Sequence, residues 1–155
     1  MIKPFKVSVP DSTLNNIYKR IRSYPWNMMQ NVNGWEYGTN YNFLKKISQY
    51  WVSRYNWKKF EKKINSFKNY KTNVEGINIH FIREKSKNPK SRPLLLLHGW
   101  PGSIIEFFDI IPRLAHPENF GGKIEDGFDV IVPSLPGFGF STPIKKALGP
   151  RKIGK

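Results

Sequence analysis

The residues best suited to chemistry form a turn with the sequence HGWPGS, which follows a run of leucines. Gly99 and Gly102 let the backbone fold tightly or adopt a positive φ, and Pro101 fixes one dihedral angle and removes a donor. Such a turn can point the backbone N–H of Trp100 into a cavity instead of a strand ladder. A fixed N–H aimed at developing negative charge is an oxyanion-hole donor. The pattern therefore predicts that the Trp100 amide stabilises a charged oxygen. Four neighbours shape the loop: His98, Gly99, Pro101 and Gly102.

An ordinary connection between a strand and a helix is the other interpretation of this turn, and spacing alone leaves both open. Ser103 and Glu106 form an S-x-x-E capping box, which predicts that a helix begins at Ser103. The positive end of that helix dipole would lie near the Trp100 amide and favour the same charge. For His98 a structural hydrogen bond is favoured over catalysis, because a lone histidine is usually satisfied locally.

Other polar side chains give weaker indications of chemistry. Asp109 lies on the predicted helix and Asp129 begins a strand, away from the position of a nucleophile. Ser134 and Ser141 lack the G-x-S-x-G context of a serine nucleophile, which favours hydrogen bonding within their loop. His80 is expected to point off the sheet face without a catalytic role.

No metal or cofactor site is predicted. Cysteine is absent, which excludes a disulfide framework and thiolate ligands. The three histidines, His80, His98 and His116, are far apart in the sequence.

The elements around the turn predict a parallel sheet. The run that starts at Pro93 is a continuous apolar strand, typical of burial on both faces, and residues 128–135 form another. The helix from Ser103 joins them, and Pro112 is expected to kink it or end it early. A strand, a crossover helix and a strand form a βαβ unit. The segments HGWPGS and PGFGFS then follow carboxyl ends of strands, where open parallel sheets carry their sites.

The segments before this unit predict a hairpin and three helices. Alternating apolar residues over 74–82, with Glu75 and Gly76 as the turn, favour a hairpin or a pair of edge strands. The first helix is expected to follow Asp11 as its N-cap, and the second to follow the Thr39-Asn40 cap. The third is expected to span residues 57–67. Their aromatic stripes favour a core or docking surface over a cofactor site.

Composition sets broad limits on function. The chain has 155 residues, 39% of them hydrophobic, which excludes a disordered tail and favours a single domain. The net charge is +15, from 26 basic and 11 acidic residues. A nucleic-acid or acidic membrane surface would explain it, but the lysines are spread along the chain, so biased composition is favoured and no specific nucleic-acid partner is predicted. No apolar run is long enough to span a bilayer, and the first residues lack a signal peptide's apolar region, which predicts a cytoplasmic protein.

Two long segments, RPLLLLHGWPGSIIEFFDIIPRLAHP and GFDVIVPSLPGFGFS, resemble the microsomal-type epoxide hydrolases, including juvenile-hormone epoxide hydrolases and bacterial relatives. PFKVSVPDSTLNNIYKRI and GTNYNFLKKISQYWVSRYNW are similar to that family's N-terminal region. The resemblance runs from Pro4 to Ser141, too long for a chance motif match. It implies an α/β fold. A helical N-terminal lead-in, residues 1–67, would precede the first strands and helix of an incomplete α/β-hydrolase sheet, residues 68–155.

The resemblance also implies a two-step hydrolysis of epoxides. An aspartate opens the epoxide and forms an ester, and a histidine oriented by an acidic residue then activates water to hydrolyse that ester. Two tyrosines of the family's lid donate protons or hydrogen bonds to the epoxide oxygen. The oxyanion hole works in the step that hydrolyses the ester. The family's substrates range from xenobiotic aromatic epoxides to terpenoid hormone epoxides.

The family's GGDWG-like nucleophile elbow does not occur in this sequence, although GPRKIGK resembles the start of the helix that leads to it. The chain is therefore expected to be an N-terminal fragment, inactive alone, that takes a small-molecule epoxide once a C-terminal part completes it. The strand at 128–135 is expected to leave an open sheet edge, suited to a partner chain or to self-association.

Two other hypotheses stay open. The aromatic helices and the charge could dock a protein, an anionic lipid or a nucleic acid without catalysis. A different α/β-hydrolase reaction, such as ester cleavage, is disfavoured by the missing G-x-S-x-G motif.

Overall fold

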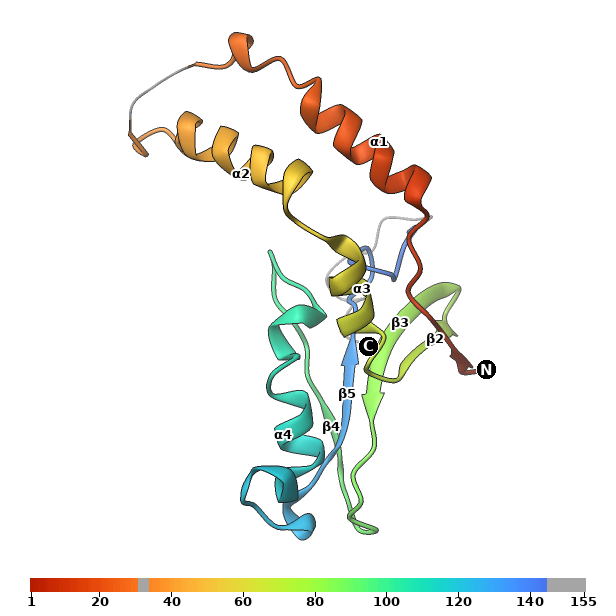
Figure 1. The fold of residues 1–155 in the computed structure, drawn as a ribbon. Coiled ribbons are helices and arrows are strands. Elements are labelled where there is room, and N and C mark those ends of the chain that lie inside the picture. Colours follow the sequence, from red (N-terminus) through yellow and green to blue (C-terminus); the bar gives the residue numbers. More distant parts are fainter. Residues whose placement is uncertain (31–33, 145–155) are drawn as a thin grey trace. The chain divides into compact units, whose positions relative to one another are not determined.

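The computed structural model describes residues 1–30 and 34–144 (Figure 1). The chain divides into two compact units, of which Val7–Ile64 is helical. Met1–Lys6 joins the chain from Asn65 onward to form the other unit, which contains the sheet.

Among its described residues the helical unit has three α-helices, two of which match their predicted starts. Its elements are α1 (Asp11–Arg22), the 3-10 helix η1 (Trp26–Met28), α2 (Tyr41–Ser53) and α3 (Trp57–Ile64). Asn40 caps α2 as predicted, because its Oδ1 accepts a hydrogen bond from the Phe43 N–H at 3.0 Å. The prediction of Asp11 as an N-cap is wrong: α1 begins at Asp11 itself, and Pro10 precedes it without a side-chain cap. Asp11 instead places its negative charge in the first turn, where the helix dipole favours it.

The sheet has five strands in the order β1-β2-β3-β5-β4 (Figure 1). They are β1 (Lys3–Pro4), β2 (Asn69–Val74), β3 (Ile77–Glu84), β4 (Pro93–Leu95) and β5 (Asp129–Pro133). The predicted hairpin is confirmed, since β2 and β3 are antiparallel and Glu75 and Gly76 turn between them with φ of 50° and 85°. The prediction that the two apolar strands run parallel is also confirmed, by the pairing of β4 with β5.

The first residues of the chain belong to the sheet unit. β1 pairs antiparallel with β2, so that Lys3 lies opposite Lys71 and Pro4 opposite Tyr70. The sequence analysis assigned residues 1–67 to one helical region, whereas the structure places Met1–Lys6 in the sheet unit. A two-residue strand leaves no periodic pattern to detect.

The edge strands of the sheet are β1 and β4, and β5 is not one of them. β5 pairs with β3 on one side and with β4 on the other, so the prediction of an open edge along residues 128–135 is wrong. The prediction that the leucine strand is buried on both faces is wrong as well, because Leu95 and Leu97 are each 56% exposed. Both errors have one cause: β4 occupies the edge position.

The segment that joins β4 to β5 is not one helix. It contains η2 (Ile104–Phe107), α4 (Ile111–Ala115), η3 (Pro117–Phe120) and η4 (Ile124–Asp126). The predicted capping box is present at Ser103 and Glu106. Pro112 lies in the first turn of α4, so it marks a helix start where the sequence predicted a kink or an end. A first-turn N–H needs no partner within the helix, which is why proline is tolerated there.

The core of the sheet unit lies between the strands and this segment. α4 packs on β3 and β5, and η2 packs on β5. The buried apolar side chains are Phe81, Ile82, Ile104, Phe108, Ile111, Ala115, Val130 and Val132. This core holds β5 and the segment after β4 in place, and it thereby positions the turn.

Candidate functional site

The turn after β4 and the loop after β5 lie at the same edge of the sheet, because the two strands run parallel. The structure joins them directly: the Leu135 N–H donates to His98 Nε2 at 3.1 Å. The sequence prediction that the two segments meet at the carboxyl ends of their strands is therefore confirmed.

His98 is a structural residue of this turn. Its side chain is buried, and Nε2 accepts from the Leu135 amide, so Nε2 carries no proton. The proton must then be on Nδ1, which lies 3.0 Å from the Gly99 carbonyl oxygen and donates to it. Both ring nitrogens are thus engaged with the backbone. This arrangement agrees with the prediction of a local hydrogen bond and leaves His98 no free nitrogen for proton transfer.

The same hydrogen bond sets the direction of the Trp100 amide. The Gly99 carbonyl and the Trp100 N–H belong to one peptide unit, and in a trans unit they point in opposite directions. Because His98 holds the carbonyl, the N–H points away from the imidazole. Within the described residues this N–H has no hydrogen-bond partner, and the Trp100 residue is 84% exposed. The turn therefore presents an oriented, unpaired donor.

The other residues of the turn differ in what they contribute. Neither Gly99 nor Gly102 has a positive φ. A Cβ on Gly102 would collide with Glu106 Oε1 and lie 2.8 Å from the Gly99 carbonyl oxygen, whereas a Cβ on Gly99 would meet nothing within 4 Å. Pro101 follows Trp100 through a cis peptide bond. Gly102 is thus the glycine that the close approach of the turn requires.

The expected helix dipole beside the turn is not formed. The element that begins after Ser103 is a four-residue 3-10 helix, too short for an aligned array of peptide dipoles. A helix dipole therefore does not add to the donor that the Trp100 amide provides at this turn.

A buried polar network that the sequence did not indicate lies behind the turn. His80 is fully buried, with Nε2 at 3.0 Å from Asn69 Oδ1 and Nδ1 at 2.9 Å from Ser134 Oγ. The Asn69 amide nitrogen donates to the Phe67 carbonyl at 2.8 Å, so its oxygen faces the imidazole. His80 therefore carries its proton on Nε2 and accepts from the Ser134 hydroxyl. Burial, followed by the charge of Lys71, lowers the pKa of His80 to about 4.

Ser141 completes this network. Its hydroxyl donates to the Ser134 carbonyl at 2.7 Å and accepts from the His80 N–H at 2.8 Å. The prediction of capping or loop hydrogen bonding is confirmed for Ser141, whereas the Ser134 hydroxyl bonds to His80 on β3 instead. These bonds fix the loop that begins at Leu135, and the Leu135 amide in turn holds His98.

The two aspartates considered from the sequence lie outside this site. Asp129 accepts from the Ser86 N–H at 3.0 Å and from the Ser91 hydroxyl at 2.9 Å. Burial opposes ionisation, but these bonds and Arg83 lower the pKa of Asp129 below its usual value. Asp129 therefore anchors the loop before β4, and Asp109 is exposed on the connecting segment.

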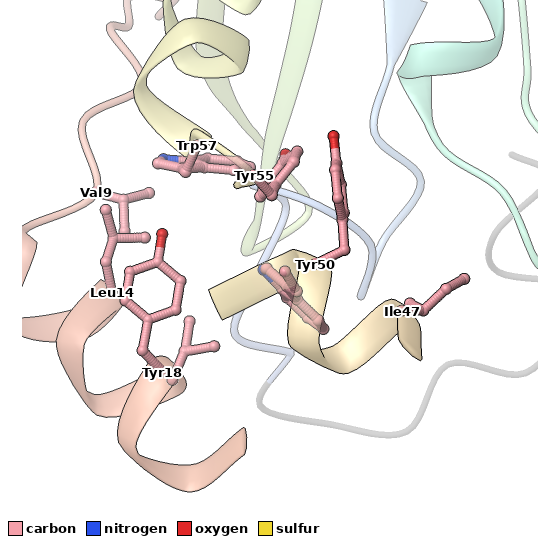
Figure 2. A pocket seen from close by; sticks show the side chains of 9 residues that line it. Val9, Leu14, Tyr18, Ile47, Tyr50, Tyr55 and Trp57 are labelled. Carbon is pink, nitrogen blue, oxygen red and sulfur yellow. The ribbon is translucent and has the colours of Figure 1, made fainter. Parts of the chain in front are cut away.

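The helical unit contains an apolar cavity of about 430 Å³ (Figure 2). Its walls come from the segment before α1, from all three helices and from Tyr55; the lining residues are Val9, Leu14, Ile17, Tyr18, Ile47, Tyr50, Trp51, Tyr55 and Trp57. Burial, then the charges of Tyr18 and Tyr50, raise the pKa of the Tyr55 hydroxyl. The predicted aromatic stripes thus line a hollow within this unit, and the docking hypothesis stays a prediction.

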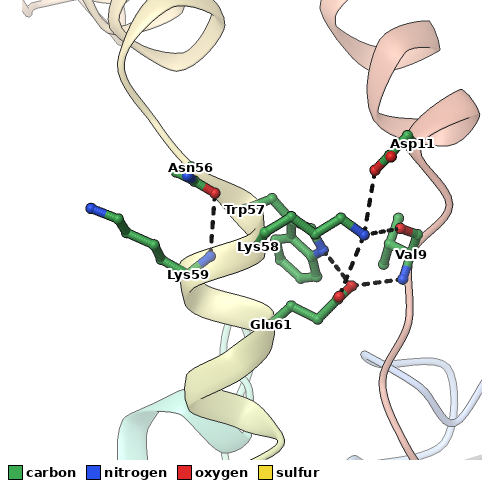
Figure 3. A network of polar contacts seen from close by, with 7 residues as sticks. All are labelled: Val9, Asp11, Asn56, Trp57, Lys58, Lys59 and Glu61. Carbon is green, nitrogen blue, oxygen red and sulfur yellow. Dashed lines mark hydrogen bonds and ion pairs between the residues drawn. The ribbon is translucent and has the colours of Figure 1, made fainter.

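A cluster of charged and polar groups links the segment before α1 to α3 within the helical unit (Figure 3). Glu61 Oε2 accepts from the Val9 N–H at 2.7 Å and from Trp57 Nε1 at 3.0 Å. Lys58 Nζ donates to the Val9 carbonyl at 2.7 Å and lies 3.5 Å from Asp11 Oδ1. The hydrogen bond from the Val9 N–H is the main reason that the pKa of Glu61 is lowered; burial opposes it, and the bond from Trp57 and the charge of Lys58 add to it. The segment before α1 is thereby fixed to α3.

Across the described residues, no group of histidine, aspartate and glutamate side chains could hold a metal ion. None of the helices described is long and apolar enough to cross a membrane.

Two known protein families match parts of this chain. Residues 2–107 match the family described as Epoxide hydrolase N terminus, and residues 92–149 match the alpha/beta hydrolase fold. The chain is 44% identical to a putative epoxide hydrolase of Stigmatella aurantiaca, over 99% of this chain and 35% of that protein. It is 41% identical to Epoxide hydrolase 1 of Sus scrofa, over 94% of this chain and 33% of that protein.

A solved structure supports the same comparison. The juvenile hormone epoxide hydrolase of the silkworm Bombyx mori superposes with a TM-score of 0.83 at 33% identity, over 99% of this chain and 37% of that chain. The chain therefore spans about a third of the length of these relatives, and it has their α/β-hydrolase fold in part.

Proposed function

This chain belongs to the family of the epoxide hydrolase N terminus, and from that premise we propose that it supplies the oxyanion-hole turn of an enzyme that hydrolyses small-molecule epoxides to diols. The observation that carries the proposal is the Trp100 amide. It is unpaired among the described residues, and His98 fixes its direction through the Gly99 carbonyl.

The chemistry needs such a donor in its second step. A carboxylate first attacks an epoxide carbon, the C–O bond breaks, and the released alkoxide takes a proton to give a hydroxy ester. Water then adds to the ester carbonyl, whose oxygen becomes negatively charged until the diol leaves and the carboxylate is restored. A preorganised N–H stabilises that oxygen, and loss of one such donor costs about 10²–10³ in rate.

In this proposal the remaining groups come from polypeptide outside the matched residues. The nucleophilic aspartate, the histidine base, its acidic partner and the lid tyrosines would be supplied by polypeptide that corresponds to the two thirds of the relatives outside the matched region. The 155 residues alone are then expected to hydrolyse no epoxide.

The test measures hydrolysis of styrene oxide by this chain alone and by this chain mixed with the part of the Stigmatella relative that the match leaves uncovered. We expect turnover only in the mixture. Trp100→Pro removes the donor and is expected to lower kcat about 100-fold, whereas Trp100→Ala keeps the N–H and is expected to stay within about threefold of the wild type.

Two results would overturn the proposal. One is hydrolysis by the 155-residue chain alone. The other is a mixture in which Trp100→Pro and Trp100→Ala lower kcat equally, because the side chain and not the amide would then matter.

A further inference from the structure

We propose that His80 is a positioning residue for the Trp100 amide, although it lies on β3 and outside the turn. It holds both ends of the loop 134–141, and this loop holds the imidazole that directs the amide. The effect on hydrolysis rests on the proposed function. The effect on the geometry of the turn does not, and it can be measured without turnover.

Both ends of the loop 134–141 are fixed to His80. The Ser134 N–H donates to the His80 carbonyl at 2.9 Å, and the Ser134 hydroxyl donates to Nδ1 of the ring at the same distance. At the other end, the Ser141 hydroxyl accepts from the His80 N–H at 2.8 Å. All three residues are buried, where such bonds are stronger than in water. One residue of β3 thus sets the distance between the two ends of the loop.

The loop between these ends is folded tightly on itself. The Phe138 N–H donates to the Leu135 carbonyl, and the Ser141 N–H donates to the Phe138 carbonyl, both at 2.9 Å. A Cβ on Gly139 would lie 3.0 Å from Ser134 Oγ, so the chain passes close to the serine hydroxyl. A displacement of Ser134 is therefore passed on to the residues that follow it.

The middle of the loop contacts His98 in two ways. The Leu135 N–H donates to Nε2 at 3.1 Å, and the Phe138 ring meets the imidazole edge to face, with centroids 5.1 Å apart. The other ring nitrogen, Nδ1, holds the Gly99 carbonyl, whose peptide unit contains the Trp100 N–H. A continuous series of contacts thus runs from the loop to the amide.

The ring of His80 must offer both an acceptor and a donor. Nδ1 accepts from the Ser134 hydroxyl, and Nε2 donates to Asn69 Oδ1 at 3.0 Å. The rings of Phe5 and Phe140 meet the imidazole edge to face, with centroids at 5.4 and 5.2 Å, and hold its plane. Loss of the acceptor alone would leave the buried hydroxyl without its partner, which is costly. The bond from Ser134 to Nδ1 is therefore the one through which the ring controls the loop.

Two substitutions separate the acceptor of the ring from its donor. In His80→Asn the side-chain oxygen can stand where Nδ1 stands and accept from Ser134, but the side chain is too short to reach Asn69. In His80→Gln the longer side chain places its amide nitrogen near the position of Nε2 and keeps the bond to Asn69, but the acceptor for Ser134 is lost. Both variants lose the ring and its contacts with the two phenylalanines. We expect the turn to shift in the Gln variant and the Asn variant to restore it.

The first test is NMR of the full 155-residue chain. In His80→Gln we expect the Leu135 amide to exchange at least about tenfold faster than in the wild type and the Trp100 amide resonance to move. In His80→Asn both signals are expected to return toward their wild-type values. The Leu96 amide, which donates to the Ile131 carbonyl on β5, is the internal control and should exchange alike in the two variants, because both lose the ring.

The second test measures hydrolysis of styrene oxide by the mixture with the uncovered part of the Stigmatella relative. His80→Gln is expected to lower kcat about tenfold, because a displaced donor stabilises the charged intermediate less well. The amide acts after the ester has formed, so kcat/KM, which reports the steps up to the ester, should stay within about threefold. His80→Asn is expected to recover at least about a third of the wild-type kcat.

Ser134→Ala removes the other partner of the same bond and keeps the ring with its packing, so it tests the bond even where loss of the ring unfolds the chain. We expect it to match His80→Gln in kcat and in the shift of the Trp100 amide. The double variant should lose no more than either single variant, because all three lack one and the same contact.

Three results overturn the inference: equal displacement of the Trp100 amide in the Asn and Gln variants, exchange at Leu96 that rises as much as exchange at Leu135, or additive effects of His80→Gln and Ser134→Ala. A displaced amide with an unchanged kcat would overturn the link between position and rate. An amide that moves as expected, in mixtures that hydrolyse no styrene oxide, supports the positioning role and counts against the proposed function.

Discussion

Within the turn, Gly102 and Gly99 stand in different surroundings. A Cβ on Gly102 would lie 2.8 Å from the Gly99 carbonyl oxygen, which is also the acceptor of the His98 hydrogen bond. The same Cβ would also collide with Glu106 Oε1, a flexible side chain, but the carbonyl is backbone. A contact that short forces the carbonyl to move, and the Trp100 amide moves with it because both belong to one peptide plane.

Substitution of these glycines is therefore expected to have unequal effects. Gly102→Ala is expected to lower the free energy of unfolding by about 1–3 kcal/mol through overpacking and to shift the Trp100 amide resonance. Gly99→Ala, where the new Cβ meets nothing within 4 Å, is expected to change the free energy by less than about 0.5 kcal/mol. Urea unfolding and ¹⁵N spectra measure both, and equal effects would contradict this account of the turn.

His80 makes the stability of the sheet unit depend on pH. Its pKa is about 4 in the folded chain, against 6.5 for an ordinary histidine, because burial disfavours the charged form. The unfolded chain therefore binds a proton that the folded chain does not bind between these values. The stabilisation is complete above pH 6.5 and is lost as the pH falls toward 4.

This linkage gives a defined expectation. The free energy of unfolding is expected to fall by about 1.5 kcal/mol between pH 6.5 and pH 5, a range above the titration of the carboxylates. His80→Gln, which does not titrate, is expected to remove that part of the slope. Urea unfolding at both pH values tests it, and an equal slope in the two proteins would rule out His80 as the source.

At the scale of elements, local signals were predictable and strand order was not. The Asn40 cap, the Glu75–Gly76 turn and the Ser103 capping box each depend on residues within a few positions of one another, so the sequence displays them. The edge position of β4 depends on where β3 inserts, and no pattern within β4 records that. Pro112 was misread because one proline can end a helix or begin the next.

The cap at Asn40 provides a test at this scale. Asn40→Ala removes the bond to the Phe43 N–H and a second bond to the Gly34 carbonyl, and it is expected to cost the helical unit about 1 kcal/mol. Asn42→Ala, an exposed change within the first turn of the same helix, is expected to be neutral or slightly stabilising. Helix content followed by circular dichroism during urea unfolding compares the two. Equal loss in both variants would show that the cap does not hold α2.

At the scale of the whole molecule, the fold class and the turn were predictable because the segments that indicate them lie within one long stretch that resembles a known family. The network around His80 was not, since its partner Ser134 is 54 positions away and neither residue belongs to a recognisable motif. The cavity in the helical unit was seen only as aromatic stripes, because spacing shows which residues share a helix face but not whether the facing helices leave space between them.

The cluster at Glu61 affects what would follow from cleavage of the backbone within the helical unit. Val9 is held to α3 by both its N–H and its carbonyl, so α1 is joined to the rest of the unit at its base as well as through the chain that leads to α2. A protease nick between α1 and α2 would therefore leave two pieces still fastened to each other.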